Sequence, residues 1–377
     1  MKNSFLSVLC FFLLFSAYAQ NTKDNYHEPF SQSYEIRKAQ HLEMRSYVDG
    51  LLKNKIDSSV ERFRPDFSSK RGYEASLYPY RKELSEYFGY PPPKIIKEQI
   101  TKTVFVGRDK YCKIYRIWIK VAEGLHTYGI LLIPVDLKGK APLIIAEHGG
   151  GGNPEAIIGI DERKPYHNFG YEAVKRGYIV WAPALTMFSD YSGDKEIPGA
   201  TRDIFDAQLK LMGTSIIGVE IHKIIAGTKA IIEKYPEIDV NNIGMAGLSW
   251  GGSFTMYTTA LWPLIKAAAI SGNATNTRIE SEKTLDPELF RKLSSSFTPF
   301  NFGYFQVIGM ICPRPCLVQL GENDPLHAIK DVYEEMNRAA LLYKELGISD
   351  RFEFKPHSGK HEFEKESIFD FFKVYLK

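Results

Sequence analysis

The sequence predicts an α/β fold with a mostly parallel sheet, antiparallel leading strands, helices on both faces and an N-terminal helical extension. Continuous apolar runs, such as residues 142–146 and 178–185, are typical of strands that are buried on both faces of a sheet. Segments with apolar residues at helical spacing separate these runs, as in a sheet of parallel strands. Before them, runs at 101–107, 111–121 and 126–135 follow one another at the spacing of an antiparallel meander.

The remaining elements follow from the same two periodicities. Later strands are expected at residues 244–249, 265–271, 316–320 and 351–357. Helices are expected at residues 41–56, 80–90, 166–177, 215–235, 251–262, 327–347 and 366–376. From residue 142 onward, strands and helices therefore alternate in the order that a covered parallel sheet requires.

The first nineteen residues have the pattern of an export signal. Lys2 supplies a positive charge, residues 5–15 form an apolar core, and Ala-Tyr-Ala at 17–19 is a small-x-small cleavage site. A lipoprotein signal ending at Cys10 is disfavoured, because further signal-like residues follow it. No later stretch approaches the roughly 20 uncharged residues that a transmembrane helix needs. The junction before Gln20 resembles signals of Bacteroidota-type bacteria, so we expect export to the periplasm, the cell surface or the medium of a Gram-negative bacterium.

A triple proline at 91–93 marks the expected boundary between two parts of the chain. Residues 20–97 are predicted to form the helical extension and residues 98–377 the α/β domain. Within that domain, residues 272–310 lack clear strand signals and follow a strand end, which favours a cap-like or substrate-binding insertion. Its aromatic residues, which would either stack on a sugar or pack in the core, include Phe297, Phe300, Phe302 and Tyr304.

The composition argues against several classes of partner and cofactor. Lys and Arg number 48 and Asp and Glu number 45, which gives no electrostatic basis for binding nucleic acid. Three cysteines follow the signal, Cys112, Cys312 and Cys316, and an odd number excludes a fully paired disulfide set. We expect buried thiols, with one bridge from Cys112 as the alternative. Zinc-ligand spacings such as C-x-x-C and H-E-x-x-H do not occur, so no zinc site is expected. The serine chemistry described below requires neither a metal nor an organic cofactor.

The strongest chemical signal is a serine between glycines, in the sequence Gly247-Leu248-Ser249-Trp250-Gly251. A predicted strand precedes this pattern and a predicted helix follows it. In that context the outer glycines permit a strained strand-to-helix turn, which lifts the serine hydroxyl above the sheet. Ser249 is therefore predicted to be a nucleophile, against the alternative of an incidental serine in a glycine turn.

A serine nucleophile needs a base and an acid that orients the base, and each is expected on a loop after a later strand. Asp324 follows the strand at 316–320, with Glu322 as its competitor. We prefer Asp324 because it lies deeper in the turn before a proline. His361 follows the last strand after a glycine-bearing loop, and its rival His357 is more simply a histidine at a strand end.

The glycines at 149–152 are suited to bind an oxyanion, because their amides are not obstructed by side chains. One donor is expected from the amide of Trp250 and the other from Gly150, with Gly151 as the next choice. Two earlier histidines are expected to be structural: His148 in the glycine loop and His222 on a predicted helix.

These motifs together carry a family resemblance. HGGGG, GLSWGG, PRPCLV followed by LGENDP, and the final GKHEF resemble bacterial α/β-hydrolases of the acetyl-xylan-esterase and dienelactone-hydrolase-like group, which includes secreted carbohydrate esterases. The resemblance extends from about Ile100 to the C-terminus. It implies an α/β-hydrolase catalytic domain with the triad Ser249, Asp324 and His361. Dienelactone hydrolases proper have a cysteine nucleophile, so the serine found here favours ester hydrolysis.

The resemblance and the export signal imply a secreted serine esterase. Its expected substrates are acetyl or methyl esters on plant-derived polysaccharides or oligosaccharides, with feruloyl and glucuronoyl esters left open. Arg202 lies in a segment similar to such esterases and could pair with a uronic-acid carboxylate, or it could be a solvated surface arginine. A prolyl-oligopeptidase-like peptidase and an inactive binding protein on the same fold are the alternatives. The sequence predicts no oligomeric state.

Overall fold

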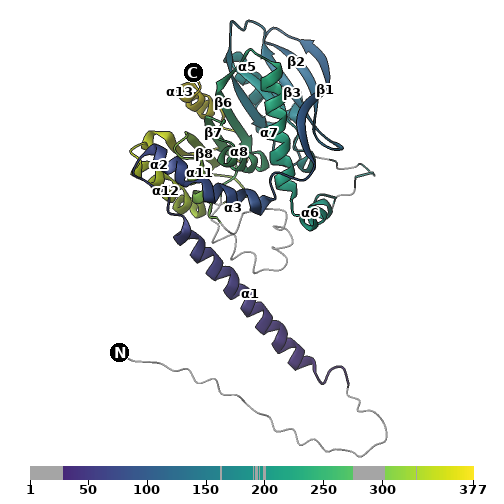
Figure 1. Cartoon of the computed structure of the whole chain (residues 1–377), viewed down its shortest axis with the longest axis vertical. Coiled ribbons are helices and arrows are strands. Elements are labelled where there is room, and N and C mark those ends of the chain that lie inside the picture. The colour runs from purple at the N-terminus through teal and green to yellow at the C-terminus, as the bar shows by residue number, and fades with distance from the viewer. Residues whose placement is uncertain are drawn as a thin grey trace, which may run out of the picture. The chain divides into compact units, whose positions relative to one another are not determined.

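Figure 1 shows the computed structural model of the chain, and its labels for helices and strands are used below. The chain divides into two compact units, residues 1–50 and residues 51–377. The described residues are 29–161, 164–189, 191, 194, 196–197, 201–274, 302–327 and 329–377. The expected export signal at 1–19 therefore lies outside the described residues, as does most of the expected insertion at 272–310. Within the described part, no helix has the length and apolar character needed to cross a membrane.

Nine strands of the described chain form one sheet, in the order β1-β2-β3-β5-β4-β6-β7-β8-β9. The antiparallel leading strands are β1 (Ile95–Arg108), β2 (Cys112–Ala122) and β3 (Leu125–Pro134). The strands that pair in parallel are β4 (Ala141–Glu147), β5 (Ile179–Pro183), β6 (Ile238–Leu248), β7 (Ala267–Ser271), β8 (Cys316–Gly321) and β9 (Phe352–His357). Each run predicted from its hydrophobic pattern is a strand, and the predicted fold class is confirmed.

Every segment that was predicted to be helical from the spacing of its apolar residues contains a helix in the structure. The helices of the described chain are α1 (Tyr34–Arg62), α2 (Lys70–Ser76), α3 (Tyr78–Phe88), α4 (Pro154–Ile158), α5 (Phe169–Lys175), α6 (Thr201–Leu211), α7 (Ile216–Lys234), α8 (Trp250–Leu261), α11 (Tyr304–Ile311), α12 (Ile329–Glu345) and α13 (Lys365–Tyr375). The pattern missed α6, which has no buried residue, and the short helices α2, α4 and α11.

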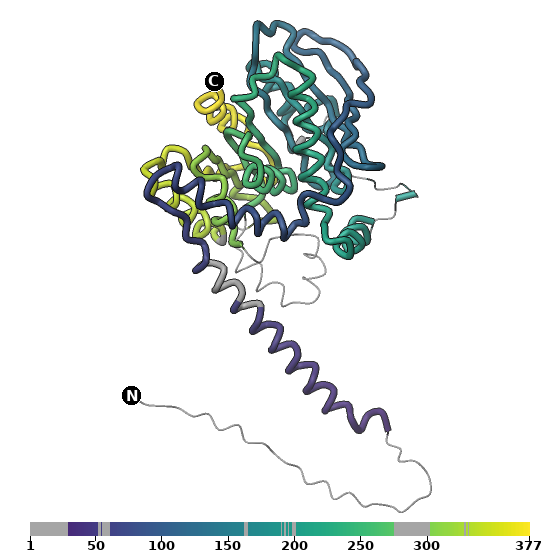
Figure 2. The backbone as a smooth tube through the Cα atoms, viewed as in Figure 1, coloured from purple at the N-terminus to yellow at the C-terminus, as the bar shows by residue number. Residues whose placement is uncertain are grey.

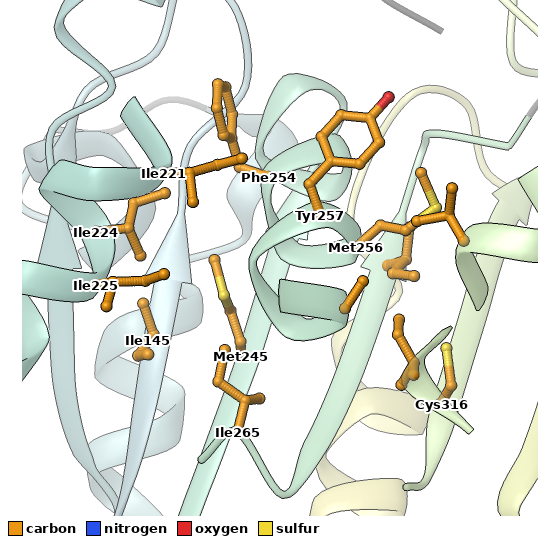
Figure 3. Packing of buried hydrophobic residues seen from close by; sticks show 14 of the residues in the cluster. Ile145, Ile221, Ile224, Ile225, Met245, Phe254, Met256, Tyr257, Ile265 and Cys316 are labelled. Carbon is orange, nitrogen blue, oxygen red and sulfur yellow. The ribbon is translucent and has the colours of Figure 1, made fainter. Parts of the chain in front are cut away.

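The core lies on both faces of the sheet because side chains alternate along each strand. On β4, Leu143 and Ile145 belong to one hydrophobic cluster, while Ile144 and Ala146 belong to the other. The first cluster includes α7 and α8, and the second includes α4, α5 and α13. Figure 1 shows α7 running along the sheet, and Figure 2 traces the same backbone. In Figure 3, Ile224 and Ile225 of α7 lie on the side of Ile145, whereas Ile221 lies beside Phe254 of α8.

The helices α2 and α3 belong to the unit that contains the sheet. The Tyr73 hydroxyl donates a hydrogen bond to the Gly309 carbonyl (3.0 Å), and Arg81 donates to the Met310 carbonyl (2.7 Å). Both acceptors are on α11, which is buried along its whole length. Part of the expected insertion is therefore a core helix, while the division of the chain at residues 97 and 98 stays a prediction.

The three cysteines in the described part are Cys112, Cys312 and Cys316. All three are buried free thiols, as expected, and the alternative of a bridge from Cys112 is not found. Burial raises the pKa of Cys112 and of Cys312, in each case to about 12, so both thiols are protonated at neutral pH.

Candidate active site

Ser249 occupies the turn between the end of β6 and the start of α8. Its backbone has φ 59° and ψ −120°, a conformation that costs free energy for any residue except glycine. Close packing requires the glycines on either side: a Cβ on Gly247 would lie 2.1 Å from the carbonyl oxygen of Gly251, and one on Gly251 would lie 2.2 Å from that of Glu147. The structure therefore contains the strained strand-to-helix turn that the glycine spacing predicts.

The glycines at 149–152 follow β4 and lie directly against this turn. A Cβ on Gly149 would lie 3.1 Å from the Cβ of Ser249, and one on Gly150 would lie 3.0 Å from Cδ1 of Trp250. The structure thus brings the two expected oxyanion donors together beside the expected nucleophile.

Backbone hydrogen bonds decide which amides of this loop can bind a ligand. Three amides are used within the protein: Gly149 donates to the Tyr166 hydroxyl (2.9 Å), Gly151 to the Phe188 carbonyl (2.7 Å) and Gly152 to the Gly149 carbonyl (3.1 Å). Gly150 is exposed, and its amide has no hydrogen-bond partner among the described residues. The amide of Trp250 is the first of α8, where a helix offers no acceptor. The geometry therefore favours Gly150 over Gly151 as the loop's donor.

His148 and His222, the two histidines that were expected to be structural, have structural partners. The Nε2 atom of His148 accepts a hydrogen bond from the Leu185 amide (3.0 Å), and its Nδ1 lies 2.8 Å from the Gly149 carbonyl. His222 lies on α7, and its Nε2 is 2.9 Å from the Val121 carbonyl. His148 therefore fixes the glycine loop, and His222 ties α7 to β2.

Asp324 and His361 form a hydrogen-bonded pair, with 2.7 Å between the carboxylate Oδ2 and Nδ1. The Asp324 side chain is 0% exposed and that of His361 is 21% exposed. Burial alone would raise the pKa of Asp324, but hydrogen bonds from His361 and from the Leu326 amide outweigh burial and hold that pKa below its ordinary value. Glu322, the competing acid, is exposed.

His357, the competing base, has different surroundings. Its Nδ1 accepts a hydrogen bond from the Gly359 amide (3.2 Å), and its Nε2 is buried without a hydrogen-bond partner among the described residues. Burial lowers the pKa of His357, so its imidazole is neutral at neutral pH. Its Nδ1 is therefore occupied by a backbone amide, whereas that of His361 faces the buried carboxylate of Asp324.

The ring of His361 lies next to the residues that support Ser249. A Cβ on Gly272 would lie 3.1 Å from Cε1 of His361. Gly272 follows Ser271, whose carbonyl accepts a hydrogen bond from the Ser249 amide (2.8 Å). The strands that carry the three expected triad positions, β6, β8 and β9, are parallel, so their carboxyl ends meet at one edge of the sheet.

Arg202, the expected substrate-binding residue, lies over two aromatic rings at the start of α6. Its guanidinium carbon is 5.3 Å from the ring centre of Phe188 and 5.8 Å from that of Trp250. The two rings are 4.4 Å apart. The side chain is 30% exposed, with a carboxylate oxygen of Asp203 at 3.6 Å. Arg202 is therefore held beside the residue that follows the expected nucleophile, and its fork still reaches solvent.

Sequence reasoning missed several residues that support the site. Asn273 donates a hydrogen bond to the Ser249 carbonyl (3.2 Å) and a second one to the Ser253 hydroxyl. Its own carbonyl accepts from the Tyr304 hydroxyl. The only sequence feature that could have indicated Asn273 is its position just after a strand. No sequence feature indicates Tyr166, because its contact with Gly149 joins segments 17 residues apart.

The aromatic residues expected in the insertion do not form a sugar-stacking wall in the described part. Phe302 is 3% exposed and Tyr304 is 2% exposed, and both belong to the hydrophobic core. Core packing, the alternative reading, is therefore correct for these two. Phe297 and Phe300 lie outside the described residues.

Comparison with solved structures gives clear matches. A Bacteroides fragilis protein, named as a candidate acetyl xylan esterase, has a TM-score of 0.64 and 17% identity, over 82% of this chain and 81% of its own. A methylesterase has a TM-score of 0.61 and 17% identity, over 86% of this chain and 68% of its own. A glucuronoyl esterase from Teredinibacter turnerae has a TM-score of 0.59 and 15% identity, over 81% of this chain and 86% of its own.

No family model matches the chain, and no curated protein matches it. At 15% to 17% identity, the likeness to these structures establishes the fold. Together with the sheet order and the strained turn at Ser249, it identifies the α/β-hydrolase fold.

Proposed function

We propose that this protein is a serine esterase that hydrolyses carboxylic esters of carbohydrates, with Ser249 as its nucleophile. The observation that carries the proposal is the strained turn at Ser249 and Trp250, against which Gly150 packs with an amide that has no partner among the described residues. The hydrogen-bonded pair of buried Asp324 and partly exposed His361 lies at the same edge of the sheet. A nucleophile, a base oriented by an acid, and oxyanion donors are the parts that acyl transfer needs.

The mechanism follows from these positions. His361 takes the proton of the Ser249 hydroxyl at Nε2, while Asp324 holds the proton on Nδ1 and stabilises the imidazolium. The Ser249 oxygen attacks the ester carbonyl, and the Gly150 and Trp250 amides donate hydrogen bonds to the oxyanion. The tetrahedral intermediate collapses, and the alcohol leaves with the proton from His361. Water, deprotonated by the same histidine, then releases the acid and restores Ser249.

The substrate class rests on two further observations. The matched structures carry the names of acetyl xylan esterase, methylesterase and glucuronoyl esterase, and the first and the last of these names refer to esters of carbohydrates. Arg202 offers a partly exposed guanidinium beside Trp250, where a carboxylate of an acidic sugar can accept two parallel hydrogen bonds. Acetyl or methyl esters on plant-derived polysaccharides or oligosaccharides are therefore the proposed substrates, and the proposed export signal at 1–19 would bring the protein to them.

The first test is hydrolysis of p-nitrophenyl acetate by the wild type, Ser249→Ala and Ser349→Ala. Ser349 is exposed on a short turn after α12, so its variant controls for the loss of a serine hydroxyl elsewhere. We expect Ser249→Ala to lose at least about 1,000-fold in kcat, because the nucleophile acts in concert with its base. Equal rates for the wild type and Ser249→Ala would overturn the proposal.

A second experiment identifies the ester. Acetate release from acetylated xylan and methanol release from methylated pectin are measured with the same three proteins, together with cleavage of a prolyl peptide. Ser249-dependent release of acetate or methanol supports a carbohydrate esterase, and Ser249-dependent peptide cleavage alone would replace it with a peptidase.

A further inference from the structure

We propose that the buried ion pair of Lys223 and Glu220 on α7 positions the two oxyanion amides, through the segment 184–188 that follows β5. The inference rests on the proposed function, because it assigns a role toward the amides of Gly150 and Trp250. Lys223 and Glu220 are positioning residues, since neither lies within the Ser249 turn or the glycine loop.

The pair is almost completely removed from solvent. Its Nζ and Oε2 atoms are 2.6 Å apart, and the two side chains are 3% and 1% exposed. Burying two charges costs more free energy than packing two apolar side chains of the same size, so stability alone does not account for the pair. The isoleucines of α7 shown in Figure 3, Ile221, Ile224 and Ile225, already attach this helix to the sheet.

Every polar atom of the pair has a partner, and the partners outside the pair belong to one short segment. Lys223 donates to the Ala184 carbonyl (3.1 Å) and to the Thr186 hydroxyl (2.7 Å). With the bond to Glu220, these contacts use all three protons of its ammonium group. Glu220 accepts from the Met187 amide (3.1 Å) at its other oxygen. The ion pair therefore holds residues 184–187 by three hydrogen bonds, two to the backbone and one to the Thr186 side chain.

The same segment holds the glycine loop on both sides of Gly150. Before Gly150, the Leu185 amide donates to Nε2 of His148 (3.0 Å). After it, the Phe188 carbonyl accepts from the Gly151 amide (2.7 Å). An oxyanion donor must be placed before the reaction begins, because a displacement of about 1 Å can cost about a hundredfold in rate.

The segment also sets the second donor. The ring of Phe188 packs on that of Trp250, with 4.4 Å between ring centres, and on Phe254 of the same helix at 5.3 Å. A shift of residues 184–188 would therefore move the glycine loop and the first turn of α8 relative to one another. Both expected donors are connected to one buried pair by these contacts.

A third buried ionisable group, Glu147, lies close enough to Lys223 for the lysine charge to lower its pKa. Glu147 ends β4 directly before His148, and both of its carboxyl oxygens are buried without a hydrogen-bond partner among the described residues. Burial and the neighbouring charge of Glu220 raise the pKa of Glu147, and the ammonium group of Lys223, which is paired with Glu220, opposes that rise. Removing the ammonium group of Lys223 would leave two buried carboxyl groups next to the loop without a cation.

The test compares Lys223→Met and Glu220→Gln with His222→Leu as the matched control. His222 is the neighbour of Lys223 on α7, and its variant also loses a buried hydrogen bond, but one to Val121 and not to residues 184–188. For p-nitrophenyl acetate, we expect Lys223→Met to lose about 10- to 100-fold in kcat with KM nearly unchanged, since oxyanion donors act in the transition state. His222→Leu is expected to keep its kcat.

Two further measurements separate positioning from general damage to the fold. The double variant Lys223→Met/Glu220→Leu replaces the pair by apolar side chains, so we expect it to fold and yet to keep the low kcat. Hydrogen exchange at the Leu185 and Gly151 amides should accelerate at least about tenfold in Lys223→Met, while exchange in β7 stays unchanged. A double variant with wild-type kcat would overturn the inference.

The proposed function and this inference fail in different ways. If the wild type has no Ser249-dependent esterase activity, the proposed function is wrong, and the exchange measurement still tests whether Lys223 holds residues 184–188. If the wild type is active and Lys223→Met retains its kcat, the inference is wrong and the proposed function stands.

Discussion

The Oδ2 atom of Asp324 lies 2.7 Å from Nδ1 of His361, and this carboxylate is fully buried although its histidine partner is partly exposed. The second oxygen of Asp324 accepts from the Leu326 amide (2.8 Å), so the acid is held from both sides. A fixed acid keeps the imidazole in one tautomer, with Nε2 free to take a proton.

Replacing the acid by its amide should therefore disable the base without removing it. Asp324→Asn is expected to lower kcat for p-nitrophenyl acetate by on the order of 10⁴, because the amide favours the wrong tautomer of His361. Glu322→Gln is the control, since Glu322 is exposed two residues earlier and is expected to keep its activity. Loss of activity in Glu322→Gln with retention in Asp324→Asn would assign the acid to Glu322 instead.

The glycine loop gives a second prediction. A Cβ on Gly150 would lie 3.0 Å from Cδ1 of Trp250, so Gly150→Ala must displace the indole or the loop that carries the proposed donor. We expect kcat to fall about 10- to 100-fold, while KM changes little. Gly107→Ala is the control, because a Cβ there meets nothing within 4 Å. Steady-state kinetics of both variants test this prediction. If Gly150→Ala has the kcat of the wild type, Gly150 is not an oxyanion donor.

The sequence predicted those parts of this site that depend on chain order. A nucleophile on a turn after one strand, an acid after a later strand and a histidine after the last strand follow from local pattern, and the parallel sheet brings their ends to one edge. Position in the loops favours Asp324 and His361 over their competitors, and the structure adds an observation in the same direction: Asp324 is buried against His361, while Glu322 is exposed.

Contacts between segments that are distant in the chain could not be predicted from the sequence. The Gly149 amide is used by Tyr166 and the Gly151 amide by Phe188, which leaves Gly150 as the donor without a partner in the described part of the chain; these contacts depend on how the loops pack and not on the pattern of either loop. The helix α6 was also missed, because it has no buried residue and therefore lacks the apolar stripe that reveals a packed helix.

Glu147 makes the free energy of unfolding depend on pH. Burial, followed by repulsion from Glu220, raises its pKa well above the ordinary value of 4.5. A raised carboxyl pKa gives stability that is complete below 4.5 and is lost as pH rises through the folded value, since the unfolded chain ionises more easily. We expect Glu147→Gln to remove this loss, which denaturant unfolding of both proteins across neutral pH would show.

Glu172 is a control of opposite sign. Hydrogen bonds from Lys175, and then from Arg176, lower its pKa to about 2 in spite of partial burial. Its contribution is present above 4.5 and is lost as pH falls toward 2, so Glu172→Gln should remove stability at neutral pH and not at acid pH. If the free energy of unfolding of Glu147→Gln falls with rising pH as steeply as that of the wild type, the loss of stability at higher pH belongs to another group.

Arg202 gives the prediction that bears on the substrate. Its guanidinium is held over Phe188 and Trp250 and is 30% exposed, so it can meet a carboxylate next to the ester while the reacting atoms stay at Ser249. Arg202→Lys keeps the charge but loses the planar fork, and we expect KM for a uronic-acid ester to rise about tenfold while p-nitrophenyl acetate is unaffected. Asp203→Asn is the matched control, because it removes the carboxylate at 3.6 Å and should leave that KM unchanged or lower. Equal KM changes for the acidic and the neutral substrate would mean that Arg202 supports the site without recognising a carboxylate.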